Sequence, residues 1–141
     1  MNASPKIKDV LAGQEHRPKY EHRRWGYYRV LDHTQADTGQ EVLTRKICVK
    51  AGSSLSYHMH TNRAEYCTIV SGKGEFVLNN EFLFVQEGDL LQIPAGSIHS
   101  MRAITDMEWI EVQRGTELGE DDTVRLFVDW DDIEKYCRSA V

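Results

Sequence analysis

The sequence predicts an all-β domain, built as a sandwich or a small barrel, with one short helix near its C-terminal end. Short runs of four to seven residues, rich in Val, Ile, Tyr and Phe, recur from Arg24 onward between glycine or Asn/Asp turn signals. Their spacing of about ten residues is typical of antiparallel sandwiches and barrels. Only residues 131–138 have the acidic start and basic end that favour a helix.

Ten strands are expected, separated by turns at residues 71–74, 78–81 and 86–89. Asn79-Asn80 is a two-residue hairpin signal, because Asn tolerates a positive φ. Pro94-Ala95-Gly96 predicts a tight bend before the strand that starts at His99. The expected strands are residues 27–31, 45–50, 54–60, 65–71, 74–78, 81–85, 89–93, 99–103, 108–113 and 124–128.

The length and composition indicate one ordinary globular domain. With 141 residues the chain has room for one core, so we expect a flexible N-terminal arm over residues 1–23 and a single domain over 24–141. The net charge of −5 argues against nucleic acid as a partner. No apolar run of membrane length and no leader is visible, so we expect no membrane association. Three cysteines at unrelated spacings suit reduced thiols in the cytoplasm.

Three histidines and one glutamate have a spacing that predicts a metal site. His58 and His60 are two residues apart, so both rings leave the same face of a strand. Glu65 follows a short turn on the returning strand, and His99 must arrive from a third strand. Neutral imidazoles and a carboxylate suit one divalent ion, without distinguishing Zn, Mn, Fe, Ni or Co.

The other three histidines of the chain do not indicate a metal site. A single histidine on a strand is more often packed or solvated than a ligand, and His16, His22 and His33 lie in polar or pre-strand sequence. We therefore expect these three to be solvated. The joint pattern, not any one histidine, indicates the metal.

Two segments resemble the two motifs of the cupin superfamily. The resemblance is carried by Gly52-x5-His58-x-His60-x4-Glu65-x6-Gly72 and by Gly88-x5-Pro94-x-Gly96-x2-His99. It implies a double-stranded β-helix, the cupin jelly-roll barrel, whose interior holds one divalent metal. Cupins host many reactions, so this resemblance implies a fold and a site but no reaction.

A narrower resemblance covers about residues 23–128 and points to the type II mannose-6-phosphate isomerase domain. It is carried by Arg24-Trp25-Gly26, Arg63-Ala64-Glu65, Ile93-Pro94-Ala95-Gly96 and, most specifically, Leu118-Gly-Glu-Asp-Asp122. It implies metal-dependent interconversion of mannose 6-phosphate and fructose 6-phosphate, or of a related sugar. In that family the domain often follows a mannose-1-phosphate guanylyltransferase. No glycine-rich nucleotide signature precedes Arg24, so a stand-alone domain is expected.

The chain departs from that family near the expected site. His58 stands where the family usually has Gln, which makes the metal set fuller. Ser100 follows His99 where the family tends to have Arg, and Glu117 replaces a Tyr. The missing arginine and the added carboxylate make binding of a phosphate group less favourable. An unphosphorylated sugar therefore remains an alternative substrate.

Isomerisation requires a base in addition to the metal ligands. Trp109, Glu111 and Gln113 form one alternating set along residues 107–113, and the family resemblance favours this set facing the cavity. Glu111 is then the expected catalytic base, with its pKa raised by apolar walls. The alternative places Ile110 and Val112 inside and leaves Glu111 solvated.

Four further residues are assigned roles around the substrate. Arg63 is expected to clamp a hydroxyl or phosphate group during catalysis, or else to pair with a nearby acid. Arg45, Gln113 and Tyr66 are expected to contact the substrate, although a solvated Arg45 is nearly as consistent with the sequence.

Two other functions stay open. Three histidines and one glutamate suit iron or manganese, which favours a metal-dependent cupin dioxygenase. A non-catalytic sugar-binding or sensor cupin is the other. The expected partners are a small sugar or sugar phosphate and a second copy of the chain. A homodimer follows from the resemblance, because cupins commonly pair through strand exchange, and residues 24–31 are placed to take part.

Overall fold

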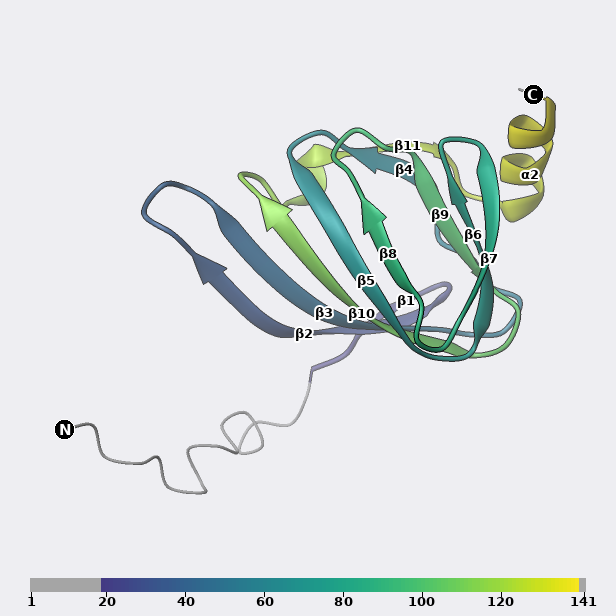
Figure 1. The fold of residues 1–141 in the computed structure, drawn as a ribbon, viewed down its shortest axis with the longest axis horizontal. Coiled ribbons are helices and arrows are strands. Elements are labelled where there is room, and N and C mark those ends of the chain that lie inside the picture. The colour runs from purple at the N-terminus through teal and green to yellow at the C-terminus, as the bar shows by residue number, and fades with distance from the viewer. Residues whose placement is uncertain (1–18, 140–141) are drawn as a thin grey trace, which may run out of the picture.

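Two antiparallel sheets face each other in the computed structural model, which describes residues 19–139 (Figure 1). The larger sheet, in spatial order, consists of β1 (Glu21–Arg23), β2 (Gly26–Gln35), β3 (Glu41–Val49), β10 (Met107–Gly115), β5 (Arg63–Ser71) and β8 (Leu90–Ile93). The smaller sheet consists of β11 (Thr123–Phe127), β4 (Tyr57–His60), β9 (His99–Ala103), β6 (Lys73–Leu78) and β7 (Glu81–Gln86). A 3-10 turn, Glu120–Asp122, precedes β11, and the helix α2 (Trp130–Ser139) follows it. The predicted jelly roll with a C-terminal helix is confirmed.

The interior between the sheets is filled by side chains that alternate along each strand. On β10, Trp109 and Gln113 are 3% and 1% exposed, whereas Ile110 and Val112 on the other face are only partly buried. This period of two is what a strand with one buried face requires. The main core cluster includes Ile47, Val49, Ile69, Phe76, Val85, Leu91, Ile93, Met101, Met107 and Trp109.

A second, smaller core lies between the smaller sheet and α2. Tyr57 of β4 is completely buried there, and its hydroxyl donates to Asn80 Oδ1 at 2.7 Å. It packs in one cluster with Trp130, Ile133 and Cys137 of the helix. Because Tyr57 takes the outer face of β4, the next residue along this strand faces the interior of the barrel.

The chain passes from one sheet to the other between β4 and β5. The sequence predicted that Glu65 lies on a returning strand, but β5 pairs with β10 and β8 in the larger sheet and not with β4. The carboxylate of Asp122 holds this crossing: its Oδ1 accepts from Thr61 N, Thr61 Oγ1 and Asn62 Nδ2 at 3.1, 2.6 and 3.0 Å. The crossing therefore lets β4 and β5 offer side chains to one cavity from opposite walls.

Two turns have the backbone that their residues predict. Asn79 and Asn80 have φ values of 47° and 70°, and they join β6 to β7 as a two-residue hairpin. Gly72, at the end of β5, has a φ of 88°, and a Cβ there would lie 2.1 Å from the carbonyl oxygen of Asp106. Glycine is required at this position by both backbone conformation and space.

The ordered domain begins earlier than the sequence predicted. Residues 21–23, assigned to the flexible arm, form β1, which pairs with β2 from Glu21 opposite Tyr28 to Arg23 opposite Gly26. Residues 1–18 of the expected arm lie outside the described residues. Within residues 19–139, no helix is both long enough and apolar enough to cross a membrane.

Candidate metal centre

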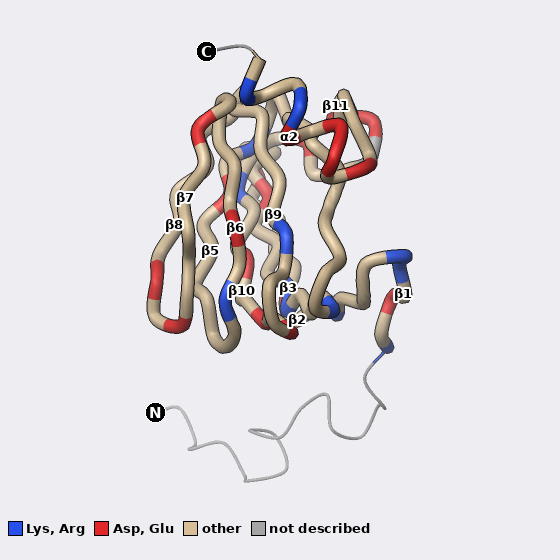
Figure 2. Tube along the Cα trace, turned by 90° about the vertical axis from the view of Figure 1, so that its right-hand side faces the viewer, with Lys and Arg blue, Asp and Glu red and all other residues tan. Residues whose placement is uncertain are grey.

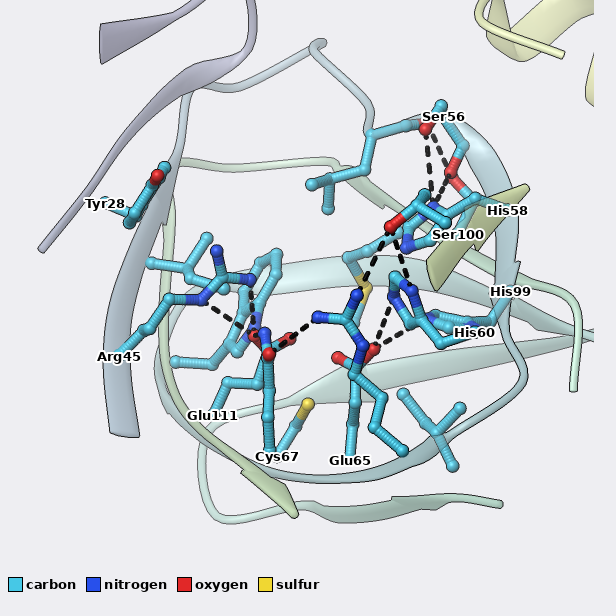
Figure 3. A pocket seen from close by; sticks show the side chains of 18 of the residues that line it. Tyr28, Arg45, Ser56, His58, His60, Glu65, Cys67, His99, Ser100 and Glu111 are labelled. Atoms are coloured by element: carbon cyan, nitrogen blue, oxygen red, sulfur yellow. Dashed lines mark hydrogen bonds and ion pairs between the residues drawn. The ribbon is translucent and has the colours of Figure 1, made fainter. Parts of the chain in front are cut away.

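The four predicted ligands converge from three strands on one end of the cavity (Figure 3). His58 and His60 lie on β4, and His99 lies on β9 directly opposite His58 in the strand pair. Glu65 reaches the group from β5 in the opposite sheet. One ligand atom from each residue lies within 4.8 Å of all the others. Ligand bonds of about 2.1 Å would hold such atoms slightly closer together, so small side-chain movements suffice for a shared ion.

Each of the three imidazole rings is oriented by a contact at its Nδ1 atom. The partners are Ser56 O for His58 at 2.7 Å, Ser97 O for His99 at 3.0 Å, and Thr123 Oγ1 for His60 at 3.1 Å. A carbonyl oxygen accepts from Nδ1–H, so Nε2 carries the lone pair in His58 and His99. Such contacts are the usual support of a histidine that ligates a metal.

Glu65 provides an independent test of whether these residues fit a metal. Its side chain is 3% exposed, and Oε1 lies 2.8 Å from His60 Nε2 and 3.5 Å from His99 Nε2. Nevertheless Oε1 is buried and accepts no well-formed hydrogen bond among the described residues. An unpaired buried carboxylate oxygen is costly, and a cation among the three Nε2 atoms would satisfy it. The donor set therefore fits one divalent ion.

The electrostatics of the group also favour ligation. Burial, together with the neighbouring imidazoles of His99 and His60, lowers the pKa of His58 to about 3. Burial opposes ionisation of Glu65, but contacts with His60 and His99 outweigh it and hold the pKa of Glu65 well below its usual range. His58 is thus kept neutral and Glu65 ionised, the forms that bind metal, whereas contacts with Glu65 outweigh burial and raise the pKa of His99.

Glu111 lies beside this group without belonging to it. It is 5% exposed on the inner face of β10, as predicted, and its Oε2 accepts from Arg45 Nε and Nη2 at 3.1 and 2.6 Å and from Gln113 Nε2 at 2.8 Å. Burial and the nearby charge of Glu65 raise the pKa of Glu111 to about 7, while Arg45 opposes the rise. The cavity therefore holds a carboxyl group that changes protonation near neutral pH.

Arg63 is buried behind the site in a network that fixes it. Nη1 donates to Gln113 Oε1 at 2.8 Å, Nη2 donates to Gly119 O at 2.8 Å, and Nε lies 3.4 Å from Asp122 Oδ2. Of the two alternatives from the sequence, the structure places Arg63 with an acid. Its hydrogen bonds position Gln113, which in turn holds Glu111.

Tyr66 is separated from the cavity. It neighbours Glu65 on β5, so alternation turns it to the opposite face, where it is 41% exposed. It is not among the residues lining the cavity, and the expected substrate contact from Tyr66 is not supported.

The cavity has a volume of about 490 Å³, enough for a small sugar derivative. It is lined by the metal group, Arg45, Glu111 and Gln113, as expected. Sequence reasoning missed other lining residues, chiefly Arg23, Arg24, Tyr28 and Arg125. The first two were assigned to or beside the flexible arm. Arg24 belongs to the Arg24-Trp25-Gly26 segment of the family resemblance, but no local pattern placed either side chain in the cavity.

Comparison with known families identifies a match over most of the chain. The family model described as "Mannose-6-phosphate isomerase C-terminal" matches residues 11–128. Xanthan biosynthesis protein XanB of Xanthomonas campestris pv. campestris is 40% identical over 113 residues, covering 79% of this chain and 23% of that protein. Mannose-1-phosphate guanylyltransferase RfbM of Salmonella typhimurium is 35% identical over 127 residues, covering 86% and 26%. The chain thus spans about a quarter of the length of these relatives.

Solved structures support the fold. KdgF from Halomonas sp. superposes with a TM-score of 0.65 at 18% identity, covering 75% of this chain and 92% of that one. Oxalate decarboxylase OxdC from Bacillus subtilis gives a TM-score of 0.65 at 22% identity, covering 78% and 30%. At these identities the likeness shows a shared cupin fold alone.

Proposed function

Because the chain belongs to the mannose-6-phosphate isomerase C-terminal family, we propose that it is a metal-dependent sugar-phosphate isomerase. The reaction is the interconversion of mannose 6-phosphate and fructose 6-phosphate, or of a closely related aldose and ketose. The observation that carries this proposal is Glu111, a buried carboxyl group that lines the cavity beside the metal group and is not one of its ligands.

The chemistry requires a group that takes a proton from one sugar carbon and returns it to the neighbouring carbon. Glu111 suits this role because burial raises its pKa above the ordinary value for a glutamate, so that the group can both accept and release a proton. Arg45 and Gln113 donate to its Oε2 and hold the carboxylate in one orientation. Arg63 supports that arrangement through Gln113 Oε1.

His58, His60, Glu65 and His99 are the residues that would hold the metal. A divalent ion bound there would supply positive charge beside the carbonyl and hydroxyl oxygens of the sugar. Trp109 and Ile93 are buried and contribute apolar side chains to the wall of the same cavity.

The test is Glu111→Gln in protein whose metal content has been measured by elemental analysis. We expect turnover of mannose 6-phosphate to fall by about 10²–10⁴-fold, since general-base catalysis is lost while the ligands stay intact. Metal content should be unchanged. Glu108→Gln is the matched control, because Glu108 is on the same strand but pairs with Lys46 outside the cavity, and it should retain activity.

Two results would contradict the proposal in different ways. Normal turnover by Glu111→Gln would remove Glu111 as the base. A wild-type protein that converts no hexose phosphate would overturn the isomerase assignment. The three-histidine, one-glutamate set also suits iron, so oxygen uptake by an iron-loaded protein would favour a dioxygenase instead.

A further inference from the structure

The wall of the cavity is cationic although the chain as a whole is acidic. The arginines that line the cavity are Arg23, Arg24, Arg45, Arg63 and Arg125. Among the described lining residues, Glu65 and Glu111 are the acidic ones, which leaves a formal excess of three positive charges. The whole chain carries a net charge of −5. A concave wall of this sign raises the local concentration of anions.

The partners of Arg63, Arg45 and Arg24 explain the positions of their guanidinium groups. Arg63 pairs with Asp122, and Arg45 pairs with Glu111. Arg24 donates to Ser54 O at 2.7 Å and to Val128 O at 3.3 Å, which fastens the turn after β1 to the rest of the domain. Backbone carbonyls do not neutralise its charge.

Arg23 and Arg45 form a pair around one aromatic ring. The strand order β1-β2-β3 places Tyr28 of β2 between them, with Arg23 diagonal to it on one neighbouring strand and Arg45 diagonal on the other. The guanidinium carbons lie 5.2 Å and 4.7 Å from the ring centroid. Arg23 Nη2 also donates to the Tyr28 hydroxyl at 3.3 Å. A ring face holds a guanidinium in place without cancelling its charge.

Both guanidinium groups keep a capacity for another acceptor. Arg45 uses Nε and Nη2 for Glu111, and Nη1 donates no hydrogen bond within residues 19–139. Arg23 donates to His22 O and to Tyr28, and its acidic neighbour Glu21 is 3.9 Å away and 59% exposed. Such a distant, solvated pair leaves the charge of Arg23 largely available.

We infer that Arg23, Tyr28 and Arg45 form a subsite for the anionic group of the substrate, a deepening that rests on the proposed sugar-phosphate isomerase function. Figure 3 shows Tyr28 and Arg45 on one side of the pocket and the three histidines on the other, with Glu111 between. A sugar whose oxygens lie at the metal group can thus extend its phosphate or carboxylate to the arginines. Figure 2 shows β1 to one side of the two sheets, with acidic Glu21 at its start and basic Arg23 at its end.

This subsite explains how a phosphate can bind although Ser100 and Glu117 depart from the family pattern. Ser100, which stands where the family tends to have Arg, is buried and donates to Leu55 O at 2.7 Å. Glu117 is exposed and does not line the cavity, so it does not repel an anion there. Arg23 of β1 and Arg45 of β3 supply the positive charge that the family's arginine after the last ligand would provide.

The test compares ligand binding by the metal-loaded protein with ligand binding by its Arg23→Gln variant. Arg23→Gln removes the charge and leaves Glu111 and its hydrogen bonds untouched. We expect its dissociation constant for mannose 6-phosphate to rise by about tenfold or more, as for loss of one charge-assisted hydrogen bond. The constant for unphosphorylated mannose should be unchanged. Glucuronate, which carries a carboxylate, is the third probe and decides whether the subsite accepts either anion.

Arg29→Gln is the matched control, because Arg29 lies on β2 next to Tyr28 but does not line the cavity, and it should bind all three probes as the wild type does. Equal weakening of mannose and mannose 6-phosphate in Arg23→Gln, or no weakening at all, overturns the subsite. Weakened mannose 6-phosphate binding in a protein that shows no isomerisation leaves the subsite standing and overturns the proposed function alone.

Discussion

At the scale of single residues, the orientation of the metal group depends on two kinds of support. His58 and His99 each contact the backbone carbonyl two residues earlier, Ser56 O and Ser97 O. Those contacts belong to the local strand geometry and need no particular side chain. His60 is different, since its Nδ1 contacts the hydroxyl of Thr123 on the neighbouring strand β11. Thr123 is therefore the supporting residue that a substitution can remove.

We predict that Thr123→Val weakens metal affinity by about 10–100-fold, because His60 loses the contact that orients its ring. Valine keeps the shape of threonine, so the fold should persist. Thr123→Ser retains the hydroxyl and is the control. Competition with a chelator of known affinity measures the effect, and an unchanged dissociation constant for Thr123→Val would show that His60 needs no such support.

The three cysteines give a second prediction at this scale. All are buried, and burial raises the pKa of the Cys48, Cys67 and Cys137 thiols. Since the thiolate is the reactive form, alkylation by iodoacetamide at neutral pH should be slow in the folded protein and rapid after denaturation. Mass spectrometry follows the labelling. Fast reaction of Cys67 would show that the cavity wall opens.

The sequence predicts the site where spacing alone determines geometry. His58 and His60 share a face because strand side chains alternate, and His99 follows a bend made by Pro94 and Gly96. The same alternation rules out Tyr66, whose neighbour Glu65 faces inward. The role predicted for this tyrosine did not take its position on the strand into account.

Side-chain alternation along one strand cannot predict contacts between strands that are distant in the sequence. Thr123 meets His60 through the pairing of β11 with β4, which no local pattern encodes. Arg23 joins the cavity because a short strand pairs with β2, although its sequence is polar and has no apolar alternation. Hydrogen bonds to a neighbouring strand, not burial, define that element.

At the scale of elements, the crossing between β4 and β5 is the feature that brings ligands together from both sheets. Asp122, from the 3-10 turn before β11, accepts hydrogen bonds from Thr61 and Asn62 and pairs with the buried Arg63. The turn Glu120–Asp122 therefore fixes a segment about sixty residues earlier in the chain. Loss of this carboxylate should loosen the crossing and the cavity together.

We predict that Asp122→Asn lowers the free energy of unfolding by about 3 kcal/mol at neutral pH, because Arg63 is left buried without its counter-charge. Asp121→Asn, at an exposed neighbouring position, should change it little. Urea unfolding of the metal-free proteins measures both differences. A loss as small as that of Asp121→Asn would mean that the carboxylate charge does not hold the crossing.

The same substitution predicts a change in pH dependence. Burial opposes ionisation of Asp122, but the Thr61 and Asn62 donors and Arg63 outweigh it and keep the pKa below its ordinary value. The unfolded chain then binds the proton at higher pH than the folded chain. The stabilisation is complete above about pH 4 and is lost as pH falls through the lower folded pKa. The gap between wild type and Asp122→Asn should therefore narrow below about pH 4.

At the scale of the whole molecule, the metal group links the two sheets across the interior. His58, His60 and His99 belong to the smaller sheet, and Glu65 belongs to the larger one. Glu65 Oε1 lies in this interior as a buried carboxylate oxygen without a hydrogen bond among the described residues, which is costly unless a cation satisfies it. An ion at this position would join both walls of the jelly roll and stabilise the domain as a unit.

We predict that saturating zinc or manganese raises the thermal midpoint of the metal-free protein. At a free metal concentration of about 100 times the dissociation constant, the free energy of unfolding rises by about 2.7 kcal/mol. For a domain of this size, this raises the thermal midpoint by roughly 5–11 °C. His60→Ala and His99→Ala should lose both stoichiometric metal and the gain, while His33→Ala, at an exposed position, keeps them. Stoichiometric metal and an undiminished rise in His60→Ala and His99→Ala would place the ion elsewhere, and the assignment of these four ligands would then be wrong.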